Sequence, residues 1–138
     1  MLSPVASPRS LEGVRILLVE DDDDIRHLLK SVLESRGAVL TAVDGTRAAI
    51  AVLESETPDI VISDITMPDE DGHALMRKVR GLPLTRGGRI PAIALTALDS
   101  REARVASRDA GFHYHLTKPV DANKLVEIVA GLVRLTGA

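Results

Sequence analysis

Side chains able to do acid, hydroxyl and amine chemistry follow short apolar runs at four places in the 138-residue chain. Glu20 and Asp21 follow the first of these runs. Asp64 follows a second, Thr96 ends a third and Lys118 comes directly after a fourth. An apolar run that ends in a polar residue is typical of a buried strand with a functional edge. These five residues are therefore the candidates for a site, provided that the fold brings their strands together.

Five apolar runs alternate with five helical patterns along the chain. The runs predict strands over residues 14–19, 39–43, 60–63, 90–96 and 113–117. Apolar spacings of three and four predict helices over about 25–33, 47–53, 73–80, 99–110 and 121–135. Runs that are apolar on both faces indicate a parallel sheet with helices on both sides. We expect an α/β, flavodoxin-like, doubly wound (βα)5 fold with a five-stranded sheet in the order 2-1-3-4-5.

In such a sheet the carboxyl ends of all strands lie at one edge, where the five polar residues should meet. Glu20, Asp21 and Asp64 would repel one another there unless a cation lay among them. Magnesium suits the site because it takes oxygen ligands and needs few carboxylates. Lys118 adds a compact positive charge, and Thr96 adds a hydroxyl donor. Phosphoryl transfer to a carboxylate requires this set of groups.

The composition limits the other classes of function. A net charge of −3, one Phe, one Tyr and no Trp argue against base stacking and against a general attraction to nucleic acid or anionic membranes. The absence of Cys excludes disulfides, thiol nucleophiles and Cys-ligated zinc. No segment has the pattern of a signal peptide or of a membrane span. We expect a cytoplasmic protein that binds neither nucleic acid nor membrane.

The N-terminal segment has the composition of a linker. Its Ser and Pro residues are Ser3, Pro4, Ser7, Pro8 and Ser10. We therefore expect residues 1–13 to form a flexible tail or linker. Residues 14–138 are expected to form one domain, since a chain of this length holds a single domain of ordinary size.

Four motifs resemble the receiver domain of two-component response regulators, in the same order and with similar spacing. They are ILLVEDD at residues 16–22, IVISDITMPDEDG at 60–72, IALTA at 93–97 and LTKP at 116–119. The resemblance extends over residues 14–135, and the choice of strand order above also depends on it. It implies a phosphoacceptor signalling domain rather than an enzyme that acts on other substrates. Its phosphoryl group would come from the phosphohistidine of a histidine kinase or a histidine phosphotransfer domain.

The resemblance also implies which residues bind the phosphoryl group and the metal. Asp64 matches the phosphoacceptor of the family. Asp21 would be a direct Mg²⁺ ligand, Glu20 would act through water, and Asp64 and the backbone carbonyl of Thr66 would complete the protein ligands. Lys118 would pair with the phosphoryl group, and its bond to the following proline is commonly cis in this family.

The resemblance further implies a conformational switch, and one residue departs from the family pattern. Thr96 matches the switch hydroxyl that moves toward the phosphoryl group. His115 stands where the family usually has Tyr or Phe that swings inward with it. A charged imidazole resists burial, so a switch through His115 would depend on pH. The alternative is a half-exposed His with no role in switching.

The expected partners follow from the resemblance and from the last two helices. Leu11-x-Gly13 and the loop 87–91 resemble receivers of hybrid histidine kinases, so the chain is expected to work as, or to be cut from, such a receiver; a stand-alone regulator is the alternative. The apolar excess of the last helix and the arginines of the fourth are compatible with a homodimer or kinase-docking surface; the alternative for the arginines is an ordinary solvated helix face. Those arginines are Arg101, Arg104 and Arg108.

Two other functions compete with the phosphoacceptor. A protein-interaction module of the same fold would never be phosphorylated, but it would have no need of the acid, Thr and Lys set. A small metal-dependent phosphatase is more distant, because nothing in the chain builds a substrate pocket.

Overall fold

The computed structural model describes residues 10–67, 71–83 and 88–135. Strands and helices alternate through these ranges. The strands are β1 Arg15–Val19, β2 Val39–Val43, β3 Ile60–Asp64, β4 Ala92–Thr96 and β5 Tyr114–Thr117. The helices are α1 Asp23–Ser35, α2 Thr46–Ser55, α3 Gly72–Arg80, α4 Arg101–Ala110 and α5 Ala122–Leu135. All neighbouring strands are parallel and the sheet order is β2-β1-β3-β4-β5, which confirms the expected flavodoxin-like fold.

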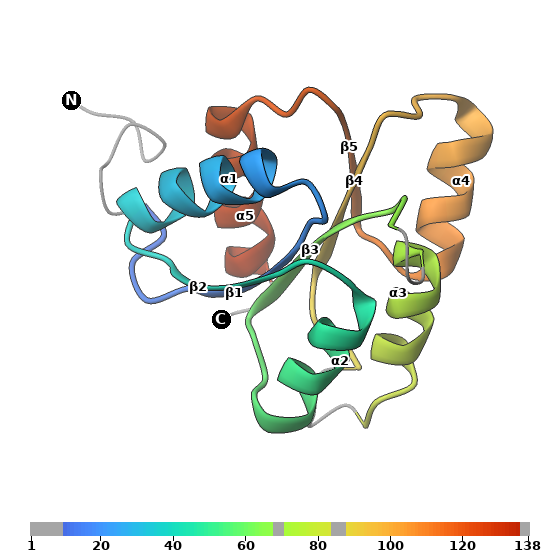
Figure 1. Cartoon of the computed structure of the whole chain (residues 1–138), viewed down its shortest axis with the longest axis horizontal. Helices are drawn as coiled ribbons and strands as arrows, with labels where there is room; N and C mark the ends of the chain where they lie inside the picture. Colours follow the sequence, from blue (N-terminus) through green and yellow to red (C-terminus); the bar gives the residue numbers. More distant parts are fainter. Residues whose placement is uncertain (1–9, 68–70, 84–87, 136–138) are drawn as a thin grey trace.

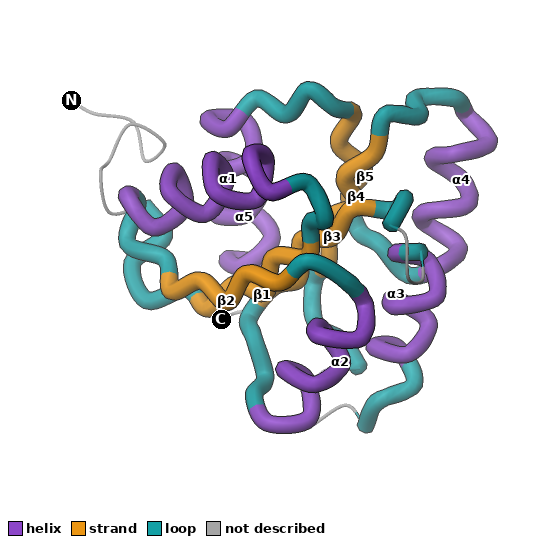
Figure 2. The backbone as a smooth tube through the Cα atoms, viewed as in Figure 1, coloured by secondary structure: helices purple, strands orange, loops and turns teal. Residues whose placement is uncertain are grey.

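The helices cover both faces of this sheet (Figures 1 and 2). One core cluster joins α1 and α5 to strand residues such as Ile16 and Leu18. The other joins α2, α3 and the end of α4 to the alternate residues Leu17 and Val19. Successive side chains of a strand point to opposite faces. All residues of β3 and β4, and all of β1 except Arg15 at its start, are therefore buried. This explains why the strands have continuous apolar sequences.

Three of the five predicted strands begin one or two residues too early, and the third strand ends one residue later than predicted. The fourth strand begins at Ala92 rather than at residue 90, because Pro91 has no N–H to donate. The carbonyl of Pro91 still accepts the N–H of Val61, at 3.0 Å. The third strand includes Asp64 itself, so this candidate residue is fixed by strand pairing rather than by a loop.

The expectation of a flexible segment up to Gly13 is wrong for residues 10–13. Leu11 is fully buried and belongs to the core that α1 and α5 share. Its N–H donates to the carbonyl of Arg36 at 2.9 Å, and the N–H of Gly13 donates to the carbonyl of Gly37 at 3.0 Å. An apolar side chain thus fixes a segment whose polar composition suggested a linker. Residues 1–9 lie outside the described ranges.

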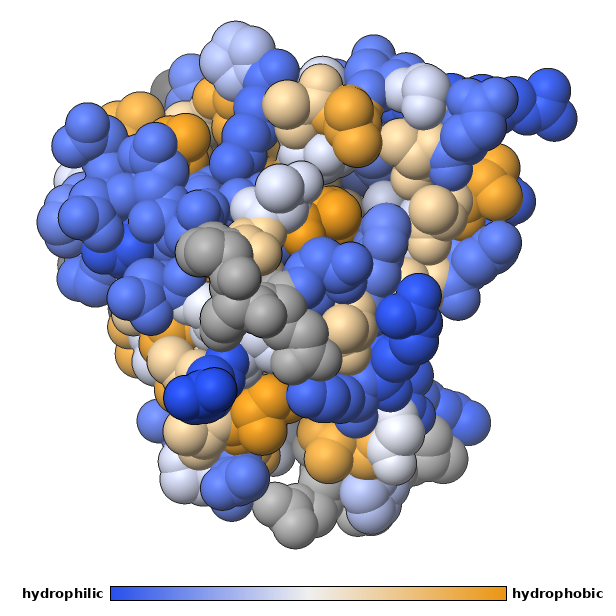
Figure 3. All heavy atoms as spheres, turned by 45° about the vertical axis from the view of Figure 1, so that its right-hand side comes forward, coloured by the Kyte–Doolittle hydropathy of each residue, from blue (hydrophilic) through white to orange (hydrophobic). Residues whose placement is uncertain are grey.

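The apolar excess of α5 is used within the domain. Leu125, Val126, Val129 and Val133 are buried, and Ile128 and Leu132 pack against the same core. Exposed large apolar side chains instead include Leu98, Val105 and Tyr114, around α4 and β5. In Figure 3, apolar residues on the visible face lie in separate groups among hydrophilic ones. None of the described helices is long and apolar enough to cross a lipid bilayer.

Candidate functional site

Three carboxylates meet at the carboxyl ends of β1 and β3. Glu20 and Asp21 directly follow β1, and Asp64 is the last residue of the adjacent β3. One carboxylate oxygen from each of the three residues lies within 4.8 Å of the other two. Glu20 and Asp64 are buried, whereas Asp21 is exposed. The fold therefore brings together the acids that the sequence singled out.

Lys118 lies between two of these carboxylates. Its Nζ is 2.7 Å from Glu20 Oε1 and 3.3 Å from Asp64 Oδ2. The N–H of Lys118 donates to the carbonyl of Thr96 at 2.8 Å, which fixes the start of the Lys118 side chain against the end of β4. The Lys118–Pro119 bond is cis, as the resemblance implied. One ammonium is thus shared by two buried carboxylates.

Glu20 is held by the start of α1. Its Oε2 accepts the N–H of Asp22 at 3.1 Å, and its carbonyl accepts Nη1 of Arg26 at 2.9 Å. Asp22 is the N-cap of α1, where its side chain accepts the N–H of Ile25 at 3.0 Å. Asp22 therefore starts the helix and is not one of the three clustered acids, so neighbouring acids of this run have different roles.

The electrostatics of the site favour a cation. Burial, a hydrogen bond with Asp21 and the negative charge of Glu20 together outweigh the opposing charge of Lys118 and raise the pKa of Asp64 from 3.8 to about 7. Burial alone would lower the pKa of Lys118, but the two carboxylates outweigh it and raise that pKa. The acids thus keep an excess of negative charge that one ammonium does not neutralise. Hard oxygen donors with such an excess fit Mg²⁺.

The backbone around Asp64 is tightly packed against the start of α3. The N–H of Thr66 donates to Asp64 Oδ1 at 3.3 Å, and Thr66 itself is exposed. Gly72 donates its N–H to the carbonyl of Ile65 at 2.8 Å. A Cβ on Gly72 would lie 2.4 Å from the carbonyl oxygen of Asp64. Gly72 ends the motif at residues 60–72, but only the structure shows that it lets α3 approach the backbone of Asp64.

Thr96 and His115 are linked through Leu98. The buried hydroxyl of Thr96 accepts the N–H of Leu98 at 3.1 Å. The carbonyl of Leu98 is 2.9 Å from His115 Nε2, so this nitrogen donates to it. His115 Nδ1 lies 3.2 Å from the hydroxyl of Ser107 on α4, which is 2% exposed. The sequence gave no signal for Ser107, because a single Ser within a helix has no distinctive spacing.

The chain is similar to known proteins over most of its length. The family model described as response regulator receiver domain matches residues 16–130, and the chain belongs to this family. It is 43% identical to an uncharacterised 14.6 kDa protein of Leptolyngbya boryana, over 88% of this chain and 91% of that protein. It is 38% identical to the response regulator FleR of Pseudomonas aeruginosa, over 86% of this chain but only 24% of FleR.

A solved structure agrees with this assignment. The receiver domain of the sensor histidine kinase PA1611 from Pseudomonas aeruginosa, described as having a magnesium ion coordinated in its active-site cleft, is 30% identical. Its TM-score is 0.81, over 88% of this chain and 98% of that structure. The chain spans nearly the whole length of the Leptolyngbya relative, but about a quarter of FleR.

Proposed function

We propose that this receiver domain accepts a phosphoryl group on Asp64 from the phosphohistidine of a histidine kinase or a histidine phosphotransfer domain. The observation that carries the proposal is the position of the Asp64 carboxylate, between the Lys118 ammonium and the acids that follow β1. A domain that only bound partners would have no physical need for buried acids around one lysine, one of which, Asp64, has a raised pKa.

The transfer depends on charge placed by the chain itself. An Asp64 carboxylate oxygen forms the bond to phosphorus, the bond from phosphorus to the imidazole nitrogen breaks, and the imidazole leaves with the electron pair and is protonated from solvent. Lys118 already lies 3.3 Å from Asp64 Oδ2, so its ammonium is placed to neutralise charge on the transferred oxygens. The domain is thus a reactant in its own phosphorylation and not an enzyme that acts on other substrates.

Asp21, Asp64 and the carbonyl of Thr66 are the residues proposed to hold Mg²⁺, with Glu20 acting through water. The donor set consists of hard oxygens and carries excess negative charge, which fits this ion. When bound, Mg²⁺ supplies the positive charge that lets the acids and a phosphoryl group lie close together. The similar PA1611 receiver, whose description includes a coordinated magnesium ion, supports the choice of metal.

The proposed switch runs from Thr96 to His115. If the Thr96 hydroxyl turns toward a phosphoryl group, it must give up the N–H of Leu98, whose carbonyl His115 holds. A neutral imidazole leaves the surface at less cost than a charged one. Partner binding should therefore rise more on phosphorylation at pH 8 than at pH 6, and this difference should shrink in His115→Tyr. Equal pH dependence in the two proteins, at equal phosphorylation, would remove His115 from the switch.

The location of the domain, its parent protein and its docking surface are further parts of the proposal. The domain is proposed to work in the cytoplasm, as part of a hybrid histidine kinase or as a stand-alone regulator, without binding nucleic acid or membrane. A homodimer or kinase-docking surface is placed on the last two helices. It rests on α4, where Arg101 and Arg108 are exposed near the apolar side chains of Val105 and Tyr114, since the apolar residues of α5 are used in the core.

Intact-mass measurement tests the phosphoacceptor directly. The protein is incubated with acetyl phosphate and Mg²⁺, and a mass increase of one phosphoryl group is expected. Asp64→Asn should abolish it, because an amide oxygen is a poor nucleophile. Asp109→Asn is the matched control, since Asp109 is an exposed acid on α4, and should be labelled normally. Unchanged labelling of Asp64→Asn would refute the assignment, and a wild-type protein that is never labelled would favour the interaction module.

A further inference from the structure

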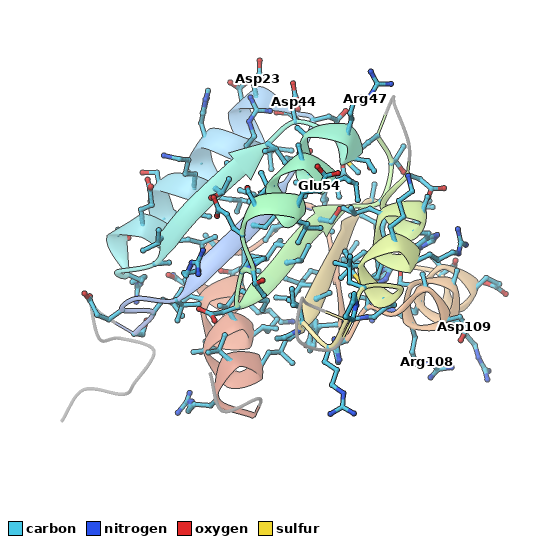
Figure 4. All side chains as sticks on the ribbon, turned by 90° about the horizontal axis from the view of Figure 1, so that it is seen from below. Asp23, Asp44, Arg47, Glu54, Arg108 and Asp109 are labelled. Carbon is cyan, nitrogen blue, oxygen red and sulfur yellow. The ribbon has the colours of Figure 1, made fainter. Side chains whose placement is uncertain are left out.

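A second cluster of charge lies where α3 and α4 end, at the opposite end of the sheet from the clustered acids. A surface hollow of about 500 Å³ is lined by Arg80, Gly88, Arg89, Arg108, Gly111, Phe112 and His113. Three of these seven residues are arginines, one is a histidine and none is acidic. Figure 4 shows Arg108 at the far edge of the molecule from Asp23 and Asp44. The hollow is therefore separate from the proposed phosphorylation site.

Arg80 forms the fixed part of this hollow. Its Nε and Nη2 donate to the carbonyl of Gly111 at 3.1 and 2.6 Å, and its Nη1 donates to the carbonyl of Gly88 at 3.2 Å. The side chain is partly buried, and burial lowers the pKa of the guanidinium. No carboxylate is paired with Arg80 among the described residues. Three of its five N–H groups donate to neutral carbonyls, which leaves its positive charge without a counter-ion.

Gly111 leaves the space that the Arg80 side chain occupies, and Gly88, whose carbonyl accepts from Arg80, lies close to the backbone of Leu82. Gly111 ends α4 with a φ of 113°, a left-handed conformation that favours glycine. A Cβ there would lie 2.8 Å from Cγ of Arg80. A Cβ on Gly88 would lie 2.4 Å from the carbonyl oxygen of Leu82. The position of Arg80 thus depends on backbone that only glycine forms without strain.

His113 adds an oriented donor. The N–H of Ala92 donates to its Nδ1 at 3.1 Å, so the neutral ring carries its proton on Nε2. Burial, followed by the charge of Arg80, lowers the pKa of His113 and favours this neutral form. His113 is exposed, and no contact of its Nε2 occurs among the described residues. Its Nε2–H is therefore available to a ligand.

Arg89 and Arg108 add two exposed positive charges to the hollow. Both are exposed, and neither takes part in an ion pair within the described part of the chain. The nearest acid in sequence, Asp109, is exposed and does not line the hollow. By contrast, Arg104 on the same helix is paired with Asp99. The hollow therefore brings together three arginines, none of which takes part in an ion pair among the described residues.

We propose that this hollow binds a small molecule through its phosphate group. Guanidinium groups match the oxygens of a phosphate in pairs, and an imidazole N–H adds a further donor. A dianion would compensate the charge of Arg80, which the protein itself leaves unpaired. The volume lies in the range of small-ligand sites. The phosphate is either free or part of a larger metabolite, and both sources offer the same group to the arginines.

Titration of the full-length protein in Mg²⁺-free buffer tests the site. Inorganic phosphate and adenosine 5′-monophosphate are the two probes, followed by the amide shifts of Gly111 and His113 in ¹H–¹⁵N spectra. We expect saturable binding of at least one probe. A preference for the nucleotide would identify a metabolite as the source, and equal binding would identify free phosphate. No saturable shift with either probe would refute the site.

Matched arginine variants complete the test. Arg89→Gln and Arg108→Gln should each raise the Kd about tenfold, since each removes one charge-assisted contact. Arg101→Gln, which removes an exposed charge from the same helix outside the hollow, should change the Kd by less than about twofold. Equal effects of all three changes, or the same shifts with chloride at equal ionic strength, would reduce the binding to general charge attraction and overturn the proposal. Because Asp64→Asn should bind the probes normally, the result is independent of phosphorylation.

Discussion

The two ends of the sheet differ in the sign of the charge that is in excess there. At the carboxyl end, Glu20 and Asp64 share the single ammonium of Lys118, so negative charge is in excess. At the amino end, Arg80 has only carbonyls and an imidazole as partners and Arg108 has no ion pair among the described residues, so positive charge is in excess. The chain as a whole carries a charge of only −3. Its small net charge therefore conceals two local excesses.

The difference lies in what each end lacks. A buried charge is stable when it is paired, so an excess of one sign marks a place where a ligand of the other sign lowers the free energy. The acids call for a cation, and the arginines call for an anion. We therefore expect that removing an ion-pair partner at the carboxyl end lowers the free energy of unfolding more than removing a hydrogen-bond donor at the amino end.

The largest expected effect is that of Lys118→Met. Glu20 is 0% exposed, and without the ammonium its charge would be buried and unpaired. The free energy of unfolding at pH 7 should fall by about 3 kcal/mol, as measured by urea denaturation. The double variant Glu20→Gln, Lys118→Met should recover much of this loss, because a neutral amide replaces the unpaired charge. An equal loss in both proteins would assign the effect to packing instead of charge.

A smaller effect with a characteristic pH dependence is expected for Asp64→Asn. Since the pKa of Asp64 rises from 3.8 in the unfolded chain to about 7 in the folded one, folding takes up a proton between these values. The wild type therefore loses stability as the pH rises from about 4 to about 7, and the Asn variant does not. The variant should gain stability relative to wild type between pH 4 and pH 8, which thermal unfolding across this range measures.

Added Mg²⁺ sharpens the same comparison. It should stabilise the wild type more than Asp64→Asn, because the variant has lost one carboxylate of the proposed site. A pH-independent difference between the two proteins would show that Asp64 does not hold a proton in the folded state near neutral pH.

The next effect concerns Mg²⁺ affinity. Asp21→Ala should weaken Mg²⁺ binding about tenfold at pH 8, since one of few carboxylate ligands is lost. Asp24→Ala is the matched control, because Asp24 is an exposed acid of the same run within the first turn of α1. Its affinity should stay close to that of wild type in a calorimetric titration. Equal weakening by the two changes would mean that the acidic run attracts the ion only through its overall charge.

The smallest effect is expected at the amino end. Arg80→Lys keeps the charge but cannot reach the carbonyls of Gly111 and Gly88 with a forked set of donors. The free energy of unfolding should fall by about 1 kcal/mol, the order of one ordinary hydrogen bond. Urea denaturation at pH 7 is the measurement. A loss as large as that of Lys118→Met would contradict the difference between the two ends.

The sequence predicted the fold and the residues that gather at the carboxyl end, but little of the amino end. Asp64 and Lys118 could be found because each lies at the end of a predicted strand, and the carboxyl ends of parallel strands meet at one edge of the sheet. Arg80 could not be found, because its partners are backbone carbonyls in two distant loops and a carbonyl has no signature in the sequence. Leu11 was missed for a related reason, since one apolar residue in a polar segment has no periodicity.

The contact of Gly72 with the backbone of Asp64 has a mechanical consequence. With 2.4 Å between the carbonyl oxygen and the position of a Cβ, there is no clearance at this joint. The N–H of Gly72 also ties the first turn of α3 to Ile65. A displacement of the Asp64 main chain should therefore move the start of α3 with it. The close packing of Gly72 against Asp64 thus couples the end of β3 directly to the start of α3.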